Sequence, residues 1–99
     1  FLFSKSAPLF PEPGQAPVLV KLRTTLRESA YLQDLPLHPS QTLVEQADDH
    51  CIFALRVIPN PNLVMDLCKH GYRLEVLEPA SLRAAVQEAL NKAIQLYET

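Results

Sequence analysis

Glycine, cysteine and tryptophan are scarce in this chain of 99 residues, which contains two glycines, two cysteines and no tryptophan. Neither Gly14 nor Gly71 lies in a glycine-rich phosphate loop, so we expect no nucleotide cofactor and no other cofactor. Cys51 and Cys68 lie in apolar runs and do not form the disulfide framework of a small secreted domain. These absences favour buried thiols in a reducing cytoplasm.

The chain also lacks a large excess of positive or negative charge, and it has no long apolar run. The net charge of −2 argues against a broad basic footprint for nucleic acid, although it leaves room for a local basic patch. No apolar run approaches the roughly 18 residues of a membrane span, and the chain does not start with a secretory signal pattern. We therefore expect a cytoplasmic protein that does not contact membranes. The chain begins at Phe1 rather than at methionine, which favours a fragment or a processed piece.

The remaining composition indicates a single domain with a hydrophobic core, since 47% of the residues are apolar. Four prolines fall within residues 1–17, so this segment is predicted to be a linker or the tail of a preceding domain. Residues 18–99 are predicted to form the folded domain.

Apolar and polar residues alternate in several short runs, which is typical of strands. Strands are predicted over residues 18–23, 41–47, 51–58 and 73–77, the second at an edge and the third in the centre of a sheet. A short helix is predicted after Thr24 or Thr25, with Leu26, Ala30 and Tyr31 on its apolar side. Asn60-Pro61 predicts the start of a second helix, and Gly71 its left-handed end.

The longest helix is predicted from Pro79 to Glu98, because proline suits a first helical turn and apolar residues then recur every three or four positions. This stripe consists of Leu82, Val86, Leu90, Ala93 and Tyr97. The order of elements predicts an α+β fold, a ferredoxin-like βαββαβ two-layer sandwich with an additional long C-terminal helix. In that fold the first and third strands are central and one face of the sheet stays open.

Arginines on the predicted open face are the candidate ligand site. Adjacent strands could bring Arg23, Arg56 and Arg73, with Lys21 beside them, to one anionic group, although cross-strand pairing with Glu75 would explain them equally well. Mixed basic and aliphatic residues on a flat face also favour a partner surface. The residues predicted for a dimer interface are Ile94 and Tyr97 on the last helix, and Leu19, Ile52 and Leu77 on the sheet.

Two other constellations were weighed against simpler explanations. His50, Cys51, Cys68 and His70 carry zinc-ligand atoms, but their spacing matches no standard zinc motif, and buried thiols with surface histidines explain them better. His38 and Ser40 could form a base and a nucleophile, but turn formation in a proline-bounded loop accounts for them. We expect neither a metal site nor catalysis.

Residues 31–97 resemble the WCX domain, the C-terminal extension of bacterial WYL-domain transcriptional regulators. The matching pieces are the loop Pro36-Leu37-His38-Pro39-Ser40-Gln41, the central strand Phe53–Val57, the leucine-rich helix ending at Gly71, and the strand-Pro-helix junction through Pro79, Leu82 and Arg83. Tyr97 lies where the final helix of that family commonly ends. The ordered set carries the resemblance.

The resemblance implies a non-enzymatic regulatory and dimerisation domain of a larger regulator. Effector binding at a WYL domain would be relayed to a winged helix-turn-helix, and DNA would be contacted only through that missing domain. The implied partners are a second copy of the chain and an effector, either nucleic acid or a small anion. A stand-alone sensor that binds an anionic ligand at the open sheet face is the alternative. A small ferredoxin-like enzyme is a third, disfavoured because no acid–base constellation is present.

Overall fold

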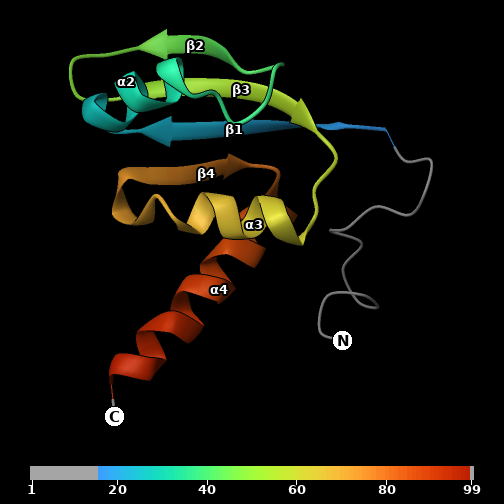
Figure 1. The fold of residues 1–99 in the computed structure, drawn as a ribbon, viewed down its shortest axis with the longest axis vertical. Coiled ribbons are helices and arrows are strands. Elements are labelled where there is room, and N and C mark those ends of the chain that lie inside the picture. The colour runs from blue at the N-terminus through green and yellow to red at the C-terminus, as the bar shows by residue number, and fades with distance from the viewer. Residues whose placement is uncertain (1–15, 99) are drawn as a thin grey trace.

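The computed structural model describes residues 16–98, which form a four-stranded antiparallel sheet and three α-helices (Figure 1). The α+β class and the long last helix are therefore confirmed. Of the predicted linker, only Ala16 and Pro17 fall within the described residues, so its role stays a prediction. The elements are β1 (Val18–Thr24), α2 (Leu26–Asp34), β2 (Thr42–Gln46), β3 (Cys51–Val57), α3 (Pro61–Cys68), the 3₁₀ turn η1 (Gly71–Arg73), β4 (Leu74–Glu78) and α4 (Ala80–Tyr97).

The strands lie in the order β2-β3-β1-β4, so the first and third strands are central and β2 is an edge, as predicted. β1 and β3 pair along their whole lengths, from Val18 opposite Val57 to Thr24 opposite Cys51. Opposite residues share a face of the sheet, and alternation buries one face of both strands. The second edge is β4, whose register against β1 shifts between Lys21 and Leu22.

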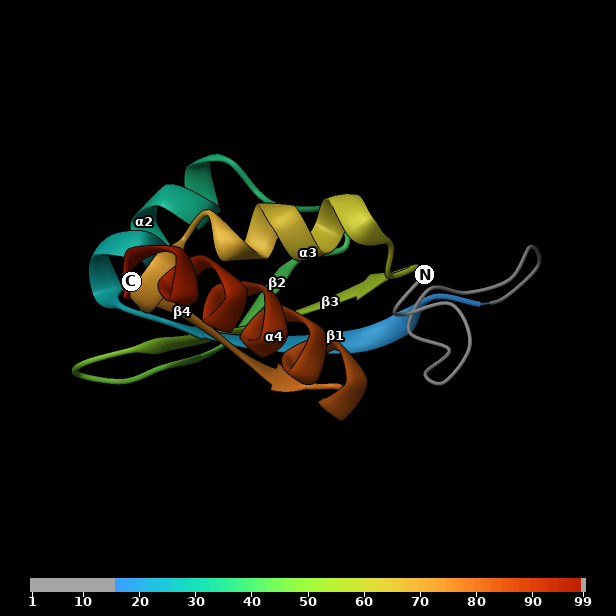
Figure 2. The same ribbon diagram turned by 90° about the horizontal axis from the view of Figure 1, so that it is seen from below.

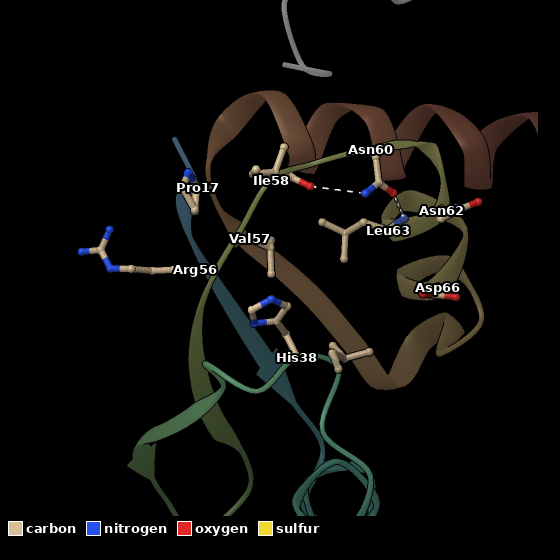
Figure 3. A pocket seen from close by; sticks show the side chains of 10 residues that line it. Pro17, His38, Arg56, Val57, Ile58, Asn60, Asn62, Leu63 and Asp66 are labelled. Atoms are coloured by element: carbon tan, nitrogen blue, oxygen red, sulfur yellow. Dashed lines mark hydrogen bonds between the residues drawn. The ribbon is translucent and has the colours of Figure 1, made fainter. Parts of the chain in front are cut away.

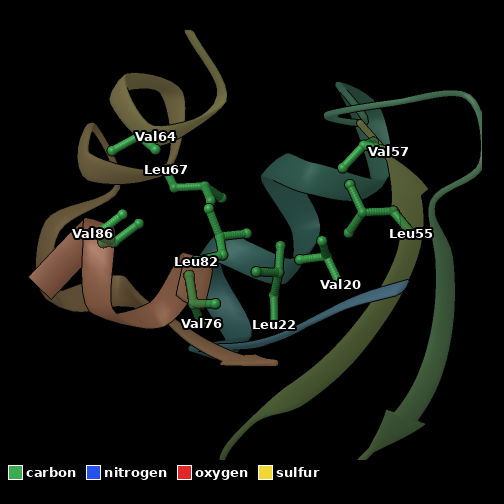
Figure 4. Packing of buried hydrophobic residues seen from close by; sticks show 10 residues of the cluster. Val20, Leu22, Leu55, Val57, Val64, Leu67, Val76, Leu82 and Val86 are labelled. Atoms are coloured by element: carbon green, nitrogen blue, oxygen red, sulfur yellow. The ribbon is translucent and has the colours of Figure 1, made fainter. Parts of the chain in front are cut away.

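The helices lie on one side of the sheet, and α4 begins there beside β4 and then runs past the sheet edge (Figures 1 and 2). Between the sheet and the helices lies an aliphatic core (Figure 4). Its buried members are Val20, Leu22, Leu55, Val57, Val64, Leu67, Val76, Leu82, Ala85 and Val86. Burial of this apolar surface is the main force that holds the layers together.

The local signals for helix ends are largely confirmed. Thr25 caps α2 by accepting a hydrogen bond from the Glu28 amide at 3.2 Å, and Asn60 caps α3 through the Leu63 amide at 2.9 Å. Gly71 has a φ of +58°, the left-handed conformation that favours glycine, but α3 already ends at Cys68, and Gly71 begins η1. Pro79 differs slightly from the prediction, because it is the extended N-cap residue and α4 begins at Ala80.

The predicted apolar side of α2 is wrong. Leu26 and Tyr31 are about half exposed, whereas Glu28, Ser29 and Leu32 are buried. Leu32 packs with Cys51 and Phe53 of β3 in a second small core, and this contact sets the rotation of the helix. The buried side of the helix therefore includes Glu28, which belongs to a polar pair described below.

The apolar stripe of α4 serves the core only in its first half. Leu82 and Val86 are buried, Leu90 is half-buried, and every residue from Asn91 to Glu98 is exposed. The helix is about 27 Å long at 1.5 Å per residue, so its second half projects beyond the domain. No helix in the described part of the chain combines the length and apolar character needed to cross a membrane.

Candidate functional site

The open face of the sheet carries balanced charges. Two rows across the strands mix the two signs: Lys21 lies opposite Glu78, and Arg23 lies between Ile52 and Glu75. Glu45 of β2 continues this second row on the other side of Ile52. The open face is therefore less basic than expected, because β4 places Glu75 and Glu78 beside the cations of β1, and β2 adds Glu45 at the other edge.

Arg23 is held by Glu75, which also binds an arginine of α4. Arg23 Nη2 donates to Glu75 Oε1 at 2.5 Å, and Arg83 Nη1 donates to Glu75 Oε2 at 2.7 Å. Arg83 Nη1 also donates to the Val76 carbonyl at 2.9 Å, so it ties α4 to the edge strand. The hydrogen bonds from Arg83 and then Arg23 lower the pKa of Glu75 below its usual value of 4.5. This cluster fits the simpler explanation of cross-strand pairing.

The three arginines do not converge. Arg56 lies opposite Leu19, four residues along β1 from Arg23, which is about 13 Å at 3.3 Å per residue. Arg73 belongs to η1 rather than to a strand, because the chain turns there before β4 begins. Its guanidinium lies 3.9 Å from Glu28 and 5.7 Å from the centre of the Tyr72 ring. Lys21 lies on the sheet face near Arg23, with its Nζ 3.9 Å from Glu78.

The residues predicted for a dimer interface fall on two separate surfaces. Leu19, Ile52 and Leu77 are half-buried on β1, β3 and β4. Ile94 and Tyr97 are 51% and 87% exposed on the projecting end of α4, together with Leu96. A groove of about 360 Å³ lies next to this end, with Leu74, Val86, Leu90 and Ile94 among its lining residues. The apolar surface of α4 is therefore continuous with the core.

Ser40 and His38 anchor a loop to the sheet. Ser40 Oγ accepts from the Arg56 amide at 2.8 Å and lies 3.0 Å from the Arg56 carbonyl, so it extends the pairing of β3 beyond β2. His38 Nδ1 lies 2.8 Å from Ser40 Oγ and accepts from the Ser40 amide at 3.1 Å. The Ser40 hydroxyl is thus engaged by backbone groups, which fits turn formation.

Gln41 fixes the other end of the same loop. Its side-chain oxygen accepts from the Leu37 amide at 2.9 Å, and its side-chain nitrogen donates to the Leu32 carbonyl at 3.0 Å. The amide group thereby joins the end of α2 to the loop. This is a physical reason for the glutamine in the Pro-Leu-x-x-x-Gln run.

A cleft of about 420 Å³ lies between this loop and the start of α3 (Figure 3). The His38 ring lies at its centre, whereas the Arg56 side chain points away from it. Pro17 borders the cleft where the described chain begins, and Asp66 of α3 lies on the opposite side. The cleft thus holds a mixture of polar and apolar groups at the N-terminal entry to the domain.

The four zinc-ligand candidates are not gathered into one site in the described part of the chain. Within residues 16–98, no group of three or more His, Cys, Asp or Glu residues is arranged to hold a metal ion. His50 pairs with Asp49 at 2.7 Å, and this contact lowers the pKa of the Asp49 carboxyl. Cys51 is buried, and partial burial raises the pKa of the Cys68 thiol, which disfavours the thiolate that a metal requires.

A buried pair between Glu28 and His70 was missed from the sequence, where His70 was expected at the surface. His70 Nδ1 bonds Glu28 Oε2, and the side chains of the two residues are 8% and 9% exposed. The edge of the Tyr31 ring packs on the imidazole at 6.3 Å between centroids. The pair joins α2 to the turn after α3, across 42 positions of sequence.

Comparison with known protein families gives a match. The family model of the WCX domain matches residues 16–94, which is most of the chain and nearly all of the described residues. No curated protein matches the chain. The matched region includes the loop anchored by Ser40 and Gln41, the Glu28–His70 pair and the first part of α4.

Proposed function

Because the chain belongs to the WCX domain family, we propose that it is a non-enzymatic regulatory domain of a bacterial WYL-domain transcriptional regulator. In this role it relays effector binding at the neighbouring WYL domain to a DNA-binding domain. The match over residues 16–94 is the observation that carries the proposal. The strand order β2-β3-β1-β4, with helices joining β1 to β2 and β3 to β4, supports a ferredoxin-like assignment.

We further propose that the domain forms a homodimer through the projecting half of α4. A helix end that exposes Ile94, Leu96 and Tyr97 beside an apolar groove is self-complementary, since the helix end of one copy can fill the groove of the other. The sheet face is a weaker candidate, because its charges are already paired within the chain. Only Arg56 of its cations makes no ion pair within residues 16–98.

Light scattering across micromolar concentrations tests the dimer. The wild type should approach twice the monomer mass, and Tyr97→Ala should raise the dissociation constant roughly tenfold or more, as truncation of a central aromatic residue does. Tyr72→Ala is the matched control, because Tyr72 is 92% exposed on η1 and does not line the groove. A wild type that stays monomeric at every concentration would exclude this dimer. A dimer weakened by Arg56→Glu but not by Tyr97→Ala would move the interface to the sheet face.

The relay is tested in the complete regulator that carries this domain. Removal of residues 18–99 should leave the truncated regulator able to bind DNA through its DNA-binding domain but abolish the response of a reporter gene to effector. A response that persists without the domain would contradict the relay.

A further inference from the structure

The Glu28–His70 pair forms the floor of a cleft of about 550 Å³ on the helical side of the domain. Three cations from three elements surround it: Arg27 in the first turn of α2, Lys69 after α3, and Arg73 in η1. Tyr31 completes the lining. We propose that this cleft binds a small phosphate-bearing anion.

Local charge is the first argument. The chain as a whole carries −2, whereas the cleft holds three permanent cations and one carboxylate, that of Glu28. That carboxylate is 9% exposed and already bonded to His70. The cations therefore outnumber the carboxylates that line the cleft by three to one, in a chain whose overall charge is negative.

The existing partners of the three cations are weak. Lys69 lies 3.3 Å from Asp66 in an exposed pair, and Arg73 lies 3.9 Å from Glu28, beyond hydrogen-bond distance. Arg27 makes no ion pair within the part of the chain that the structure describes. An anion entering the cleft thus replaces water and weak contacts rather than a strong internal salt bridge.

The walls of the cleft are fixed before any ligand arrives. The Thr25 amide donates to the Arg73 carbonyl at 3.1 Å, which joins η1 to the residue that caps α2. The Glu28–His70 bond joins the same two segments a second time. Because both arginines stand on backbone that these bonds hold, binding has to order their side chains but not the backbone beneath them.

Phosphate is the chemistry that best fits two arginines and a lysine. Guanidinium groups give planar, two-pronged hydrogen bonds to phosphate oxygens, and lysine adds a compact positive charge. The exposed rings of Tyr31 and Tyr72 flank the arginines and offer a surface for an attached organic group. The site is independent of the regulator proposed above, since it depends only on the surface of this domain.

Pyrophosphate titrated into the isotopically labelled 99-residue chain and followed by NMR tests the site. We expect saturable shifts confined to the amides of residues 25–31 and 69–73. The double substitution of Arg27→Gln and Arg73→Gln should weaken binding at least tenfold, as loss of charge-assisted hydrogen bonds does. Arg56→Gln is the matched control on the sheet face and should leave the affinity unchanged.

Two results would overturn the proposal. One is the absence of saturable shifts at pyrophosphate concentrations up to about 10 mM, since a site weaker than that carries little specific free energy. The other is equal weakening by Arg56→Gln and by the double substitution, which would indicate general attraction of anions. Circular dichroism and thermal unfolding of each variant separate a lost site from a lost fold. Should the double variant unfold, Lys69→Gln replaces it, and unchanged affinity in that folded variant would also count against the site.

Discussion

Removal of either member of the Glu28–His70 pair should destabilise the domain far more than removal of an exposed ion pair. In Glu28→Ala the buried imidazole loses its partner. In His70→Ala a carboxylate that is 9% exposed keeps only the distant Arg73, at 3.9 Å. Because a buried polar group without a partner bears its full desolvation cost, each single variant leaves an uncompensated group.

The magnitude follows from the burial of both side chains. Breaking a buried pair costs about 3–5 kcal/mol, a large part of the roughly 5–15 kcal/mol of a whole domain. If the free energy of unfolding falls by about 1.5 kcal/mol per molar urea, a loss of about 3 kcal/mol in that free energy lowers the urea concentration at the unfolding midpoint by about 2 M. The double variant should lose much less than the sum, with a coupling free energy of roughly 1–3 kcal/mol.

Urea unfolding followed by circular dichroism, on the wild type and all three variants, measures this coupling. The four proteins form a double-mutant cycle. His70→Ala removes the contact with Tyr31 whether or not Glu28 is present, so this loss cancels from the coupling free energy. The exposed Glu88–Lys92 pair of α4, at 3.8 Å, is the control and should couple by only about 0.3–0.5 kcal/mol. A Glu28–His70 coupling no larger than that of the control would refute the reasoning.

Two further predictions concern a buried hydroxyl and an exposed carboxylate. Thr24 is 2% exposed and its hydroxyl has no hydrogen-bond partner within residues 16–98, so Thr24→Val should stabilise the domain by about 1 kcal/mol in thermal unfolding. Thr42→Val, whose hydroxyl donates to the sheet at 3.4 Å, should give no such gain. Glu75 has a folded pKa below its unfolded value of 4.5, so its contribution is complete above pH 4.5 and is lost as the pH falls through the lower folded pKa. Because Glu75 is 39% exposed, screening limits this contribution to stability to about 1 kcal/mol or less. Glu75→Gln should therefore reduce the loss of stability at acid pH by that amount, as measured by unfolding across a pH series. An unchanged pH dependence in the variant would contradict the assignment.

Local signals explain why so much of the fold could be predicted. Thr25, Asn60 and Gly71 act within one turn of their own position, and alternation along β1 and β3 specifies which face is buried. These features need no knowledge of distant contacts. The role of Gln41 also lies close in sequence, since its partners are Leu32 and Leu37.

The candidate site depends on contacts between residues far apart in the sequence, which local patterns do not predict. Glu28 and His70 are 42 residues apart, and they meet only because η1 docks against the start of α2. The same turn carries Arg73 away from the sheet face, where simple alternation had placed it. No signal for the pair is present in the sequence, because the predicted apolar side of α2 was that of Leu26, Ala30 and Tyr31, and only the structure shows that Glu28 is buried and therefore needs a partner.

The two proposed sites meet at one point of the backbone. Arg73 lines the basic cleft, and Leu74, the next residue, lines the groove beside α4 and packs against both parts of the core. A ligand in the cleft can change dimerisation only if it binds the monomer and the dimer with different affinities. Because Leu74 and Ile94 both line the groove, the backbone that carries Arg73 continues directly into the groove wall. The short connection between η1 and β4 therefore supplies a route by which a ligand cleft and a dimer groove within one domain could be coupled.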